Sequence, residues 1–308
     1  MSKRATREAL GATLAELARE GADIFAVDAD LARATTLQVF GNAYPDRLLN
    51  VGIAEQDMMG VAAGIALTGA TVFTGSFAAF GTGRCYDQIR NTVCESRLNV
   101  KVCPTHAGIT VGEDGATHQM LEDIGLMRGL PGMRVLVPAD YHAARAAIRL
   151  AADVEGPVYI RFSRFATEEI YDEAVEGHLP WATVLREGTD VSLIACGVEV
   201  EQALFAADLL AREGVSAEVI DVESVKPLAE DLICASAAKT GHVITAEDHC
   251  VATGLGAAVS ELLAERCPTP TRFVGMRSFG TSGSAEALLE HFALDAMGIK
   301  ATALDLLR

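Results

Sequence analysis

The stretch Leu48-Leu-Asn-Val-Gly-Ile-Ala-Glu55-Gln-Asp57 decides the fold, because it leads from a short apolar strand through a glycine turn into a helix. That helix continues through Met58–Leu67, where small residues permit close packing, and Gly69 is a suitable stop. A carboxyl group at such a junction is poorly solvated, and desolvation favours its protonated form. Glu55 is therefore predicted to be a catalytic acid, although an acid that only stabilises the start of a helix gives the same local pattern.

An aromatic pair follows the next predicted strand, Thr71–Thr74. Phe77-Ala-Ala-Phe80 places two rings close to the end of this strand. Two aromatic faces suit a flat heteroaromatic ring, and core packing at helical spacing is the competing interpretation. The pair gains weight from its place shortly after Glu55.

A polar, glycine-rich segment then carries two histidines and two acids: His106-Ala-Gly-Ile-Thr-Val-Gly-Glu-Asp114-Gly-Ala-Thr-His118-Gln119. This density of titratable groups exceeds what a connection between elements needs. We expect a functional loop here, with His118 able to donate a proton or stabilise a developing oxyanion.

Strand and helix patterns alternate along the chain, which predicts an α/β fold with parallel sheets. The expected helices are 8–20, 55–67, one from about 83, 140–152 and one through Val200–Leu210; the expected strands are 24–27, 71–74, 99–105, 134–138, 157–160, 191–197, 217–222 and 242–246. The fold class is therefore two open, mainly parallel α/β sheet domains. The first covers residues 1–165 and the second covers residues 189–308, joined by a polar linker at 166–188 that contains the only tryptophan.

Composition restricts the classes of function. The 308 residues are half hydrophobic, enough for two domains, and the formal charge of −17 argues against binding nucleic acid. No apolar run reaches membrane-spanning length and the first seven residues lack the apolar core of a secretory signal, so we expect a cytoplasmic protein with no membrane contact. Seven cysteines without C-x-x-C pairs indicate reduced thiols rather than a zinc site or disulfides.

Taken together, Gly-Ile-Ala-Glu-Gln around Glu55, the Phe77/Phe80 pair and Gly-Glu-Asp-Gly-Ala-Thr-His-Gln resemble the thiamine-dependent transketolase family. The resemblance is to its pyrimidine-binding and carboxy-terminal domains, and it covers nearly the whole chain. Further matching segments occur in the family's order: Thr6-Arg7, Asp28-Ala-Asp-Leu31, Pro138-Ala-Asp140, Phe162-Ser-Arg164, Glu247-Asp-His249 and Gly254-Leu-Gly256.

The family's amino-terminal domain, with Gly-Asp-Gly and a following Asn that hold the magnesium diphosphate, has no counterpart here, and no other phosphate-binding glycine loop is present. The resemblance therefore implies a split transketolase whose partner is an amino-terminal subunit carrying the diphosphate-binding domain. Thiamine diphosphate would lie at the interface, with Mg²⁺ held mainly by the partner chain and no metal site on this one. The family also implies an α2β2 assembly and sugar phosphate substrates.

The resemblance assigns roles residue by residue. Glu55 matches the acid that contacts the pyrimidine nitrogen, and the phenylalanines match the pocket around that ring. The remaining matches are Asp30 and Leu31 near the thiazolium, His118 beside a substrate oxygen, Asp114 at a sugar hydroxyl, and Arg7, His106 and Arg164 at a substrate phosphate. The second domain is expected to serve assembly and stability, and His249 is expected to be structural.

Two positions depart from the family. Gly83 stands where transketolases commonly have a tyrosine, with Arg84 or Tyr86 as possible replacements, and Ala34 stands where they have a phosphate-binding serine, beside Arg33. These departures leave the ketose donor and aldose acceptor open among ordinary, branched and sulfonated sugars.

The implied activity is transfer of a two-carbon ketol unit from a ketose phosphate to an aldose phosphate. Deoxyxylulose phosphate synthase and the β subunit of a 2-oxoacid dehydrogenase are the related alternatives, and Arg84-Cys-Tyr-Asp-Gln88 resembles the synthase locally. The segment Asp114–His118 favours sugar chemistry over the dehydrogenase. A non-catalytic regulatory subunit is the alternative from another class.

Overall fold

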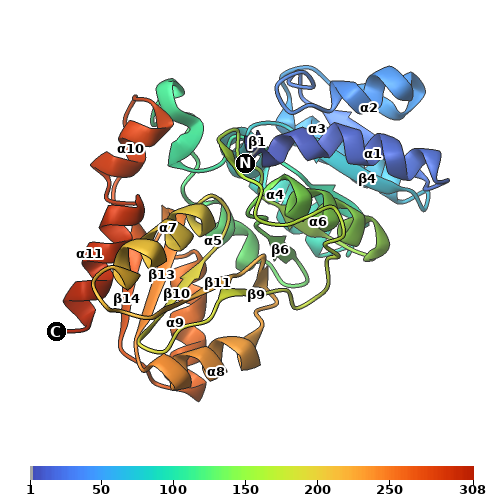
Figure 1. Ribbon diagram of the computed structural model, residues 1–308. Helices are drawn as coiled ribbons and strands as arrows, with labels where there is room; N and C mark the ends of the chain where they lie inside the picture. The colour runs from blue at the N-terminus through green and yellow to red at the C-terminus, as the bar shows by residue number, and fades with distance from the viewer. Residues whose placement is uncertain (1–2) are drawn as a thin grey trace.

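The structure is a computed structural model that describes residues 3–308. Two α/β halves lie side by side in Figure 1, the first coloured blue to green and the second yellow to red. Each half contains a mainly parallel sheet with helices on both faces. The predicted fold class is confirmed.

The first half contains a seven-stranded sheet. Its strands, in spatial order, are β12 (Ser224–Lys226), β6 (Arg134–Leu136), β7 (Val158–Ile160), β5 (Val100–Val102), β4 (Thr71–Gly75), β2 (Ile24–Asp28) and β3 (Leu48–Asn50). All neighbours are parallel except β12, which runs antiparallel to β6. The carboxyl ends of the parallel strands therefore share one edge of the sheet.

Apolar stripes on the helices cover both faces of this sheet. One face packs against α1 (Ala9–Arg19) and α6 (Tyr141–Asp153), and the other against α3 (Glu55–Ala66) and the helical segments that follow β4. The shorter elements are η1 (Thr6–Glu8), α2 (Gln38–Ala43), η2 (Pro45–Arg47), α4 (Tyr86–Gln88), η5 (Ile109–Asp114) and α5 (Asp123–Arg128).

The second half contains a five-stranded sheet in the order β14 (Thr271–Met276), β13 (Val243–Cys250), β10 (Val191–Ala195), β11 (Ala217–Asp221) and β9 (Thr183–Arg186). Only β9 is antiparallel to its neighbour. The helices are α7 (Glu199–Ala211), α8 (Glu230–Thr240), α9 (Leu255–Arg266), α10 (Ala285–His291) and α11 (Ala296–Leu306).

Several contacts join the two halves. Strand β12 comes from the second half of the chain but completes the first sheet, and β8 (Ala166–Glu168) returns to pair with β1 (Lys3–Ala5). One apolar cluster also runs continuously from α3 and α5 to α8 and α9. The halves therefore share a core rather than meeting at a thin interface.

Most of the expected elements occur within a few residues of their predicted bounds, and Asp140 caps α6 by accepting a bond from the Ala143 amide at 2.8 Å. The helix expected from about residue 83 is different. Helical structure begins at Ala79 and includes two π-helical segments, η3 (Ala79–Arg84) and η4 (Ile89–Cys94). Wider π turns have no distinctive sequence period, and they occur often at functional sites.

None of the helices within residues 3–308 is long and apolar enough to cross a membrane. All seven cysteines are free thiols, and four of them are buried. No group of three or more His, Cys, Asp or Glu within the same residues is arranged to hold a metal ion.

Candidate active site

Glu55 is the first residue of α3, and the turn before the helix directs it toward the carboxyl edge of the first sheet. The Asn50 side chain accepts a hydrogen bond from the Gly52 amide at 2.8 Å, and Gly52 has a φ of 78°, which favours glycine. The Glu55 side chain is only 5% exposed. Its Oε1 lies 3.4 Å from Nη1 of Arg84, whose side chain is 54% exposed. A buried carboxyl group therefore has one neighbouring cation.

The aromatic pair lies beside this ion pair. Phe77 and Phe80 follow β4, and their rings are stacked with centroids 6.2 Å apart. The Arg84 guanidinium lies 4.1 Å from the centre of the Phe80 ring, so it bridges the ring and the Glu55 carboxyl. Two of the three residues predicted to surround a heteroaromatic ring, Glu55 and Phe80, thus contact one arginine.

The two histidines of the polar segment join the same cluster. The segment 106–121, called the histidine loop below, starts at the end of β5. His106 lies 3.8 Å from Phe77 between ring centroids, and His118 lies 5.2 Å from Phe80. His118 is partly exposed, and its Nδ1 lies 3.0 Å from the Thr117 hydroxyl. The loop therefore brings both predicted histidines to the aromatic pair.

His106 is buried and uncharged. Burial, together with the neighbouring charges of Arg7 and Arg164, lowers its pKa to about 3. Arg7 Nη1 donates to Nε2 at 3.2 Å, so the ring proton is on Nδ1 and points to the Thr105 hydroxyl at 2.7 Å. His106 consequently acts as a fixed neutral group that orients the Arg7 guanidinium.

The predicted basic residues converge here. Arg7 also donates to the Ala34 carbonyl at 2.9 Å, and its pKa is lowered by burial and then by the charge of Arg164. Asp114, predicted to contact a sugar hydroxyl, forms an ion pair with Arg164 at 3.3 Å. Part of the positive charge at this position is therefore balanced within the chain.

Asp30 and Leu31 occupy a turn at the end of β2. Asp30 has a φ of 64° and accepts a bond from the Asn50 amide group at 3.3 Å. The Leu31 amide donates to the carboxylate of Asp28 at 3.0 Å. Burial raises the pKa of Asp28 to about 6 even though backbone amides stabilise its charge. A cavity of about 270 Å³ opens beside this turn, lined by Asp30, Leu31, Ala32, Arg33, Ala34, Gln38 and Asn50.

All but one of the predicted residues come from the carboxyl edge of the first sheet. Asp30 follows β2, Glu55 follows β3, Phe77 and Phe80 follow β4, the histidine loop follows β5, and Arg164 follows β7. Arg7 comes from η1. Ligands of open α/β sheets bind at such an edge, which supports a single site.

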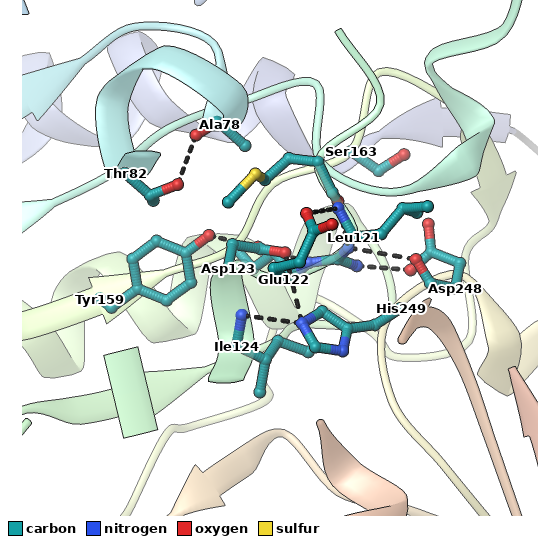
Figure 2. Close-up of polar contacts among 12 residues, drawn as sticks. Ala78, Thr82, Leu121, Glu122, Asp123, Ile124, Tyr159, Ser163, Asp248 and His249 are labelled. Atoms are coloured by element: carbon teal, nitrogen blue, oxygen red, sulfur yellow. Dashed lines mark hydrogen bonds and ion pairs between the residues drawn. The ribbon is translucent and has the colours of Figure 1, made fainter. Parts of the chain in front are cut away.

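A buried polar cluster lies behind this site, and the sequence indicated Asp248 and His249 of it but not Arg161 or Asp123. Arg161, at the end of β7, contacts Asp123 and Asp248 from opposite sides, and Figure 2 shows both acids with Tyr159 and His249. His249 accepts from the Ile124 amide at 3.1 Å, and burial lowers its pKa to about 4. A charged residue in the otherwise apolar strand end Tyr159-Ile-Arg-Phe162 was the available signal.

Comparison with known proteins identifies the family. The family model of the transketolase pyrimidine-binding domain matches residues 2–168, and that of the transketolase C-terminal domain matches residues 181–299. A transketolase C-terminal section from Methanocaldococcus jannaschii is 42% identical over 95% of this chain and 93% of its own length. The 6-deoxy-6-sulfo-D-fructose transketolase subunit of a Clostridium species is 44% identical over 93% of this chain and 89% of its own.

A solved structure has the same fold over its whole length. It is a split-gene transketolase in an inactive β4 tetramer, with a TM-score of 0.92, 44% identity and 99% of both chains covered. The resemblance noted in the sequence is therefore confirmed. The chain belongs to the transketolase family and corresponds to the carboxy-terminal section of its split members.

Proposed function

We propose that this chain is the carboxy-terminal subunit of a two-chain transketolase, which transfers a two-carbon ketol unit from a ketose phosphate to an aldose phosphate. The observation that supports it most is the convergence of a buried acid, two stacked phenylalanines, two histidines and two arginines at one sheet edge. No other part of residues 3–308 combines these groups.

The residues fit one part of thiamine diphosphate. Phe77 and Phe80 offer aromatic faces to the pyrimidine ring, and Glu55 offers a carboxyl group at its edge. The residues that would hold the diphosphate and Mg²⁺ belong to the proposed amino-terminal partner, in keeping with the absent Gly-Asp-Gly segment. When bound, thiamine diphosphate supplies the carbanion chemistry that cleaves and forms the carbon–carbon bond.

The chain's own residues divide the remaining tasks. Glu55 exchanges a proton with the pyrimidine nitrogen, because its buried carboxyl group lies at the edge of the aromatic pair. His118, partly exposed above Phe80, donates to or accepts from a substrate oxygen. Arg7, fixed by His106, and Arg164 attract an anionic group of the sugar.

We place the partner surface along α3. Ile53 and Leu67, at the two ends of this helix, are 77% and 74% exposed. Between them Gly60 and Gly64 are exposed, and no atom lies within 4 Å of a Cβ built on either glycine. A partner backbone can approach this face closely beside Glu55, which supports the proposed α2β2 assembly.

The test mixes the purified chain with its candidate amino-terminal partner, thiamine diphosphate and Mg²⁺, and measures two-carbon transfer from xylulose 5-phosphate to ribose 5-phosphate. Each chain alone is the control. Parallel reactions contain 6-deoxy-6-sulfofructose as donor, or pyruvate. Transfer only in the mixture supports the proposal, decarboxylation of pyruvate would replace it with the synthase, and inactivity with every donor would leave the regulatory subunit.

A further inference from the structure

The histidine loop is held from behind by the second domain. Its front carries His106, Asp114 and His118 toward the proposed site, and its back packs against β13 and the segment 279–284. Figure 2 shows part of this contact, with Asp248 and His249 of β13 facing Leu121, Glu122 and Asp123. The second domain therefore touches the loop that bears the proposed catalytic histidine.

Arg161 is the centre of the contact. Its Nε donates to Asp123 at 2.8 Å, its Nη1 donates to the Asp248 carboxylate, and its Nη2 donates to the carbonyls of Asp248 and Met120 at 3.2 and 3.4 Å. The three charged side chains are at most 5% exposed. Met120 O also accepts from the Gly108 amide at 2.9 Å, so the arginine fastens the two ends of the histidine loop together.

Asp248 touches the loop directly as well. Its Oδ2 accepts from the Thr110 hydroxyl at 3.5 Å. Gly108 has a φ of 82°, and a Cβ at this position would lie 1.7 Å from the same oxygen. The carboxylate is thus packed against loop backbone two residues from His106, where only glycine fits.

A second contact fixes the other end of the loop. Gln119, adjacent to His118, donates through Nε2 to the Thr281 carbonyl at 2.8 Å and to the Gly112 carbonyl at 3.2 Å. The Ser282 hydroxyl donates to the Glu113 carbonyl at 2.6 Å. The histidine loop is therefore bound to the second domain at two places, through Asp248 and through the segment 279–284.

We propose that Asp248, acting through Arg161 and Thr110, is a positioning residue that holds the histidine loop and so places His106 and His118 in the active site. This assigns the second domain a part in catalysis beyond assembly and stability. The catalytic consequence rests on the proposed function, whereas the effect on the loop can be measured without it. The contacts at Asp248 and at Ser282 are independent of each other. The hold on the loop can therefore be tested with one substitution of large expected effect and one of small expected effect.

The first experiment compares Asp248→Asn with Glu247→Gln by hydrogen exchange of the whole chain. Glu247 is the matched control, because it is equally buried on β13 but accepts from the Leu255 and Gly256 amides of α9 instead of touching the loop. In Asp248→Asn we expect the amides of Gly108 and His118 to exchange about ten-fold faster or more, with β10 and β11 unchanged. In Glu247→Gln the loop should keep its wild-type protection.

The pKa of His106, measured by NMR, is a second readout. It does not change when the folded protein only loses overall stability. The His106 ring is buried with a pKa of about 3, so its resonance does not titrate near neutrality. A loosened loop exposes the ring, and its pKa in Asp248→Asn should rise toward the ordinary value of about 6.5. The resonance is assigned with His106→Gln.

Ser282→Ala is the second variant, in case Asp248→Asn does not fold. Ser282 is exposed, and its matched control Ser284→Ala removes a hydroxyl that caps α10 rather than one that contacts the loop. We expect faster exchange across residues 112–118 in the first variant only, by about two- to five-fold, the size of one exposed hydrogen bond.

The catalytic readout uses the complex with the partner subunit. Asp248→Asn should lower kcat about ten-fold while the Kd of thiamine diphosphate is unchanged, because Glu55 lies on α3 and Phe80 on η3, outside the histidine loop. Wild-type protection and kcat in a folded Asp248→Asn protein would overturn the inference, as would wild-type protection of the loop in Ser282→Ala where Asp248→Asn does not fold. A different result is a loop that is loosened in Asp248→Asn together with a wild-type complex that transfers no ketol unit. This result would overturn the proposed function but not the positioning role of Asp248.

Discussion

The two sheets of this protein are both mainly parallel, but one has an open carboxyl edge and the other has a covered one. In the first sheet the edge is open, and Asp30, Phe80 and His118 remain accessible there. In the second sheet the edge is covered by the first domain. Val137 pairs with Glu223 and Gly197 through backbone bonds of 2.7 and 3.2 Å, and Asp248 pairs with Arg161.

This difference explains why one domain carries the candidate site. Parallel strands direct their loops and side chains to the carboxyl edge, so each sheet has one natural place for a ligand. At the covered edge, polar side chains bond to other parts of the same chain, as His249 does to the Ile124 amide. Polar residues at the open edge should therefore matter for activity, and those at the covered edge for stability and positioning.

Glu55→Gln is the strongest test of the open edge. Loss of this carboxyl group should reduce ketol transfer by about 10³-fold, within the usual range for general acid–base catalysis, while circular dichroism and association with the partner stay unchanged. Asp57→Asn is the matched control, since Asp57 is an exposed acid in the same first turn of α3. A near-normal rate for Glu55→Gln would remove Glu55 from the mechanism.

A pair of histidine variants compares the two edges directly. His118→Asn should lower kcat/KM about 100-fold with little effect on unfolding, because the ring is partly exposed and its one hydrogen-bond partner within residues 3–308 is the Thr117 hydroxyl. His249→Asn should leave the Ile124 amide without its acceptor and cost about 1–3 kcal/mol of stability. Chemical denaturation and steady-state rates measured on both variants check the contrast, and equal kinetic losses in the two would break it.

The buried His106 predicts a pH dependence of stability. Its pKa is about 3 in the folded chain and 6.5 ordinarily, so the unfolded chain binds more protons between these values. Its contribution to the free energy of unfolding therefore falls as pH is lowered from 6.5 toward 3, by up to about 1.4 kcal/mol per pH unit.

Urea unfolding of wild type and His106→Gln at several pH values tests this dependence. Subtracting the free energy of unfolding of one protein from that of the other at each pH cancels the contributions of the buried acids. The substituted protein should lose the His106 slope, whereas His291→Gln, on the exposed end of α10, should keep it. Parallel pH profiles for wild type and His106→Gln would show that the ring is not buried in its neutral form.

The smallest expected effect concerns Arg84, which occupies the space between Glu55 and Phe80. The Arg84 side chain is exposed, and ion pairs with an exposed arginine contribute about 0.2–1 kcal/mol. Because the pair opens when the cofactor ring binds Glu55, Arg84→Ala should tighten thiamine diphosphate binding by roughly 1.4- to 5-fold. Arg90→Ala is the matched control, because Arg90 bonds Asn91 instead. Calorimetry on the assembled complex measures both, and weaker binding in Arg84→Ala would show that this arginine contacts the cofactor.

Local sequence patterns predicted the main elements of the first sheet and the residues at its open edge. Alternating strand and helix periods located β10, α7, β11 and β13 in the second half of the chain, but not α8, α9, β14, α10 or α11. The short motifs around Glu55, Phe77 and His118 indicated residues that the structure brings together. The residue roles at this edge remain predictions. The covered edge was not predictable in the same way, because Arg161, Asp123 and Asp248 meet only after distant segments pack together.

Two other features also depended on tertiary structure. The π-helical turns of η3 and η4 have no period of their own, so the sequence predicted only an ordinary helix that starts too late. The Asp114–Arg164 ion pair joins residues 50 apart in sequence, and a family role at a sugar hydroxyl gave no sign of it. Long-range electrostatic partners of this kind are set by packing.

Strand β12 has a consequence for how this protein can be divided. Because residues 224–226 form an outer strand of the first sheet, a fragment that ends near residue 165 would expose the unpaired edge of β6. Bare strand edges recruit other chains, so such a fragment should aggregate, whereas the intact chain closes that edge itself. A gene fusion or domain exchange must therefore transfer both halves of the chain together, so that β12 stays paired with β6.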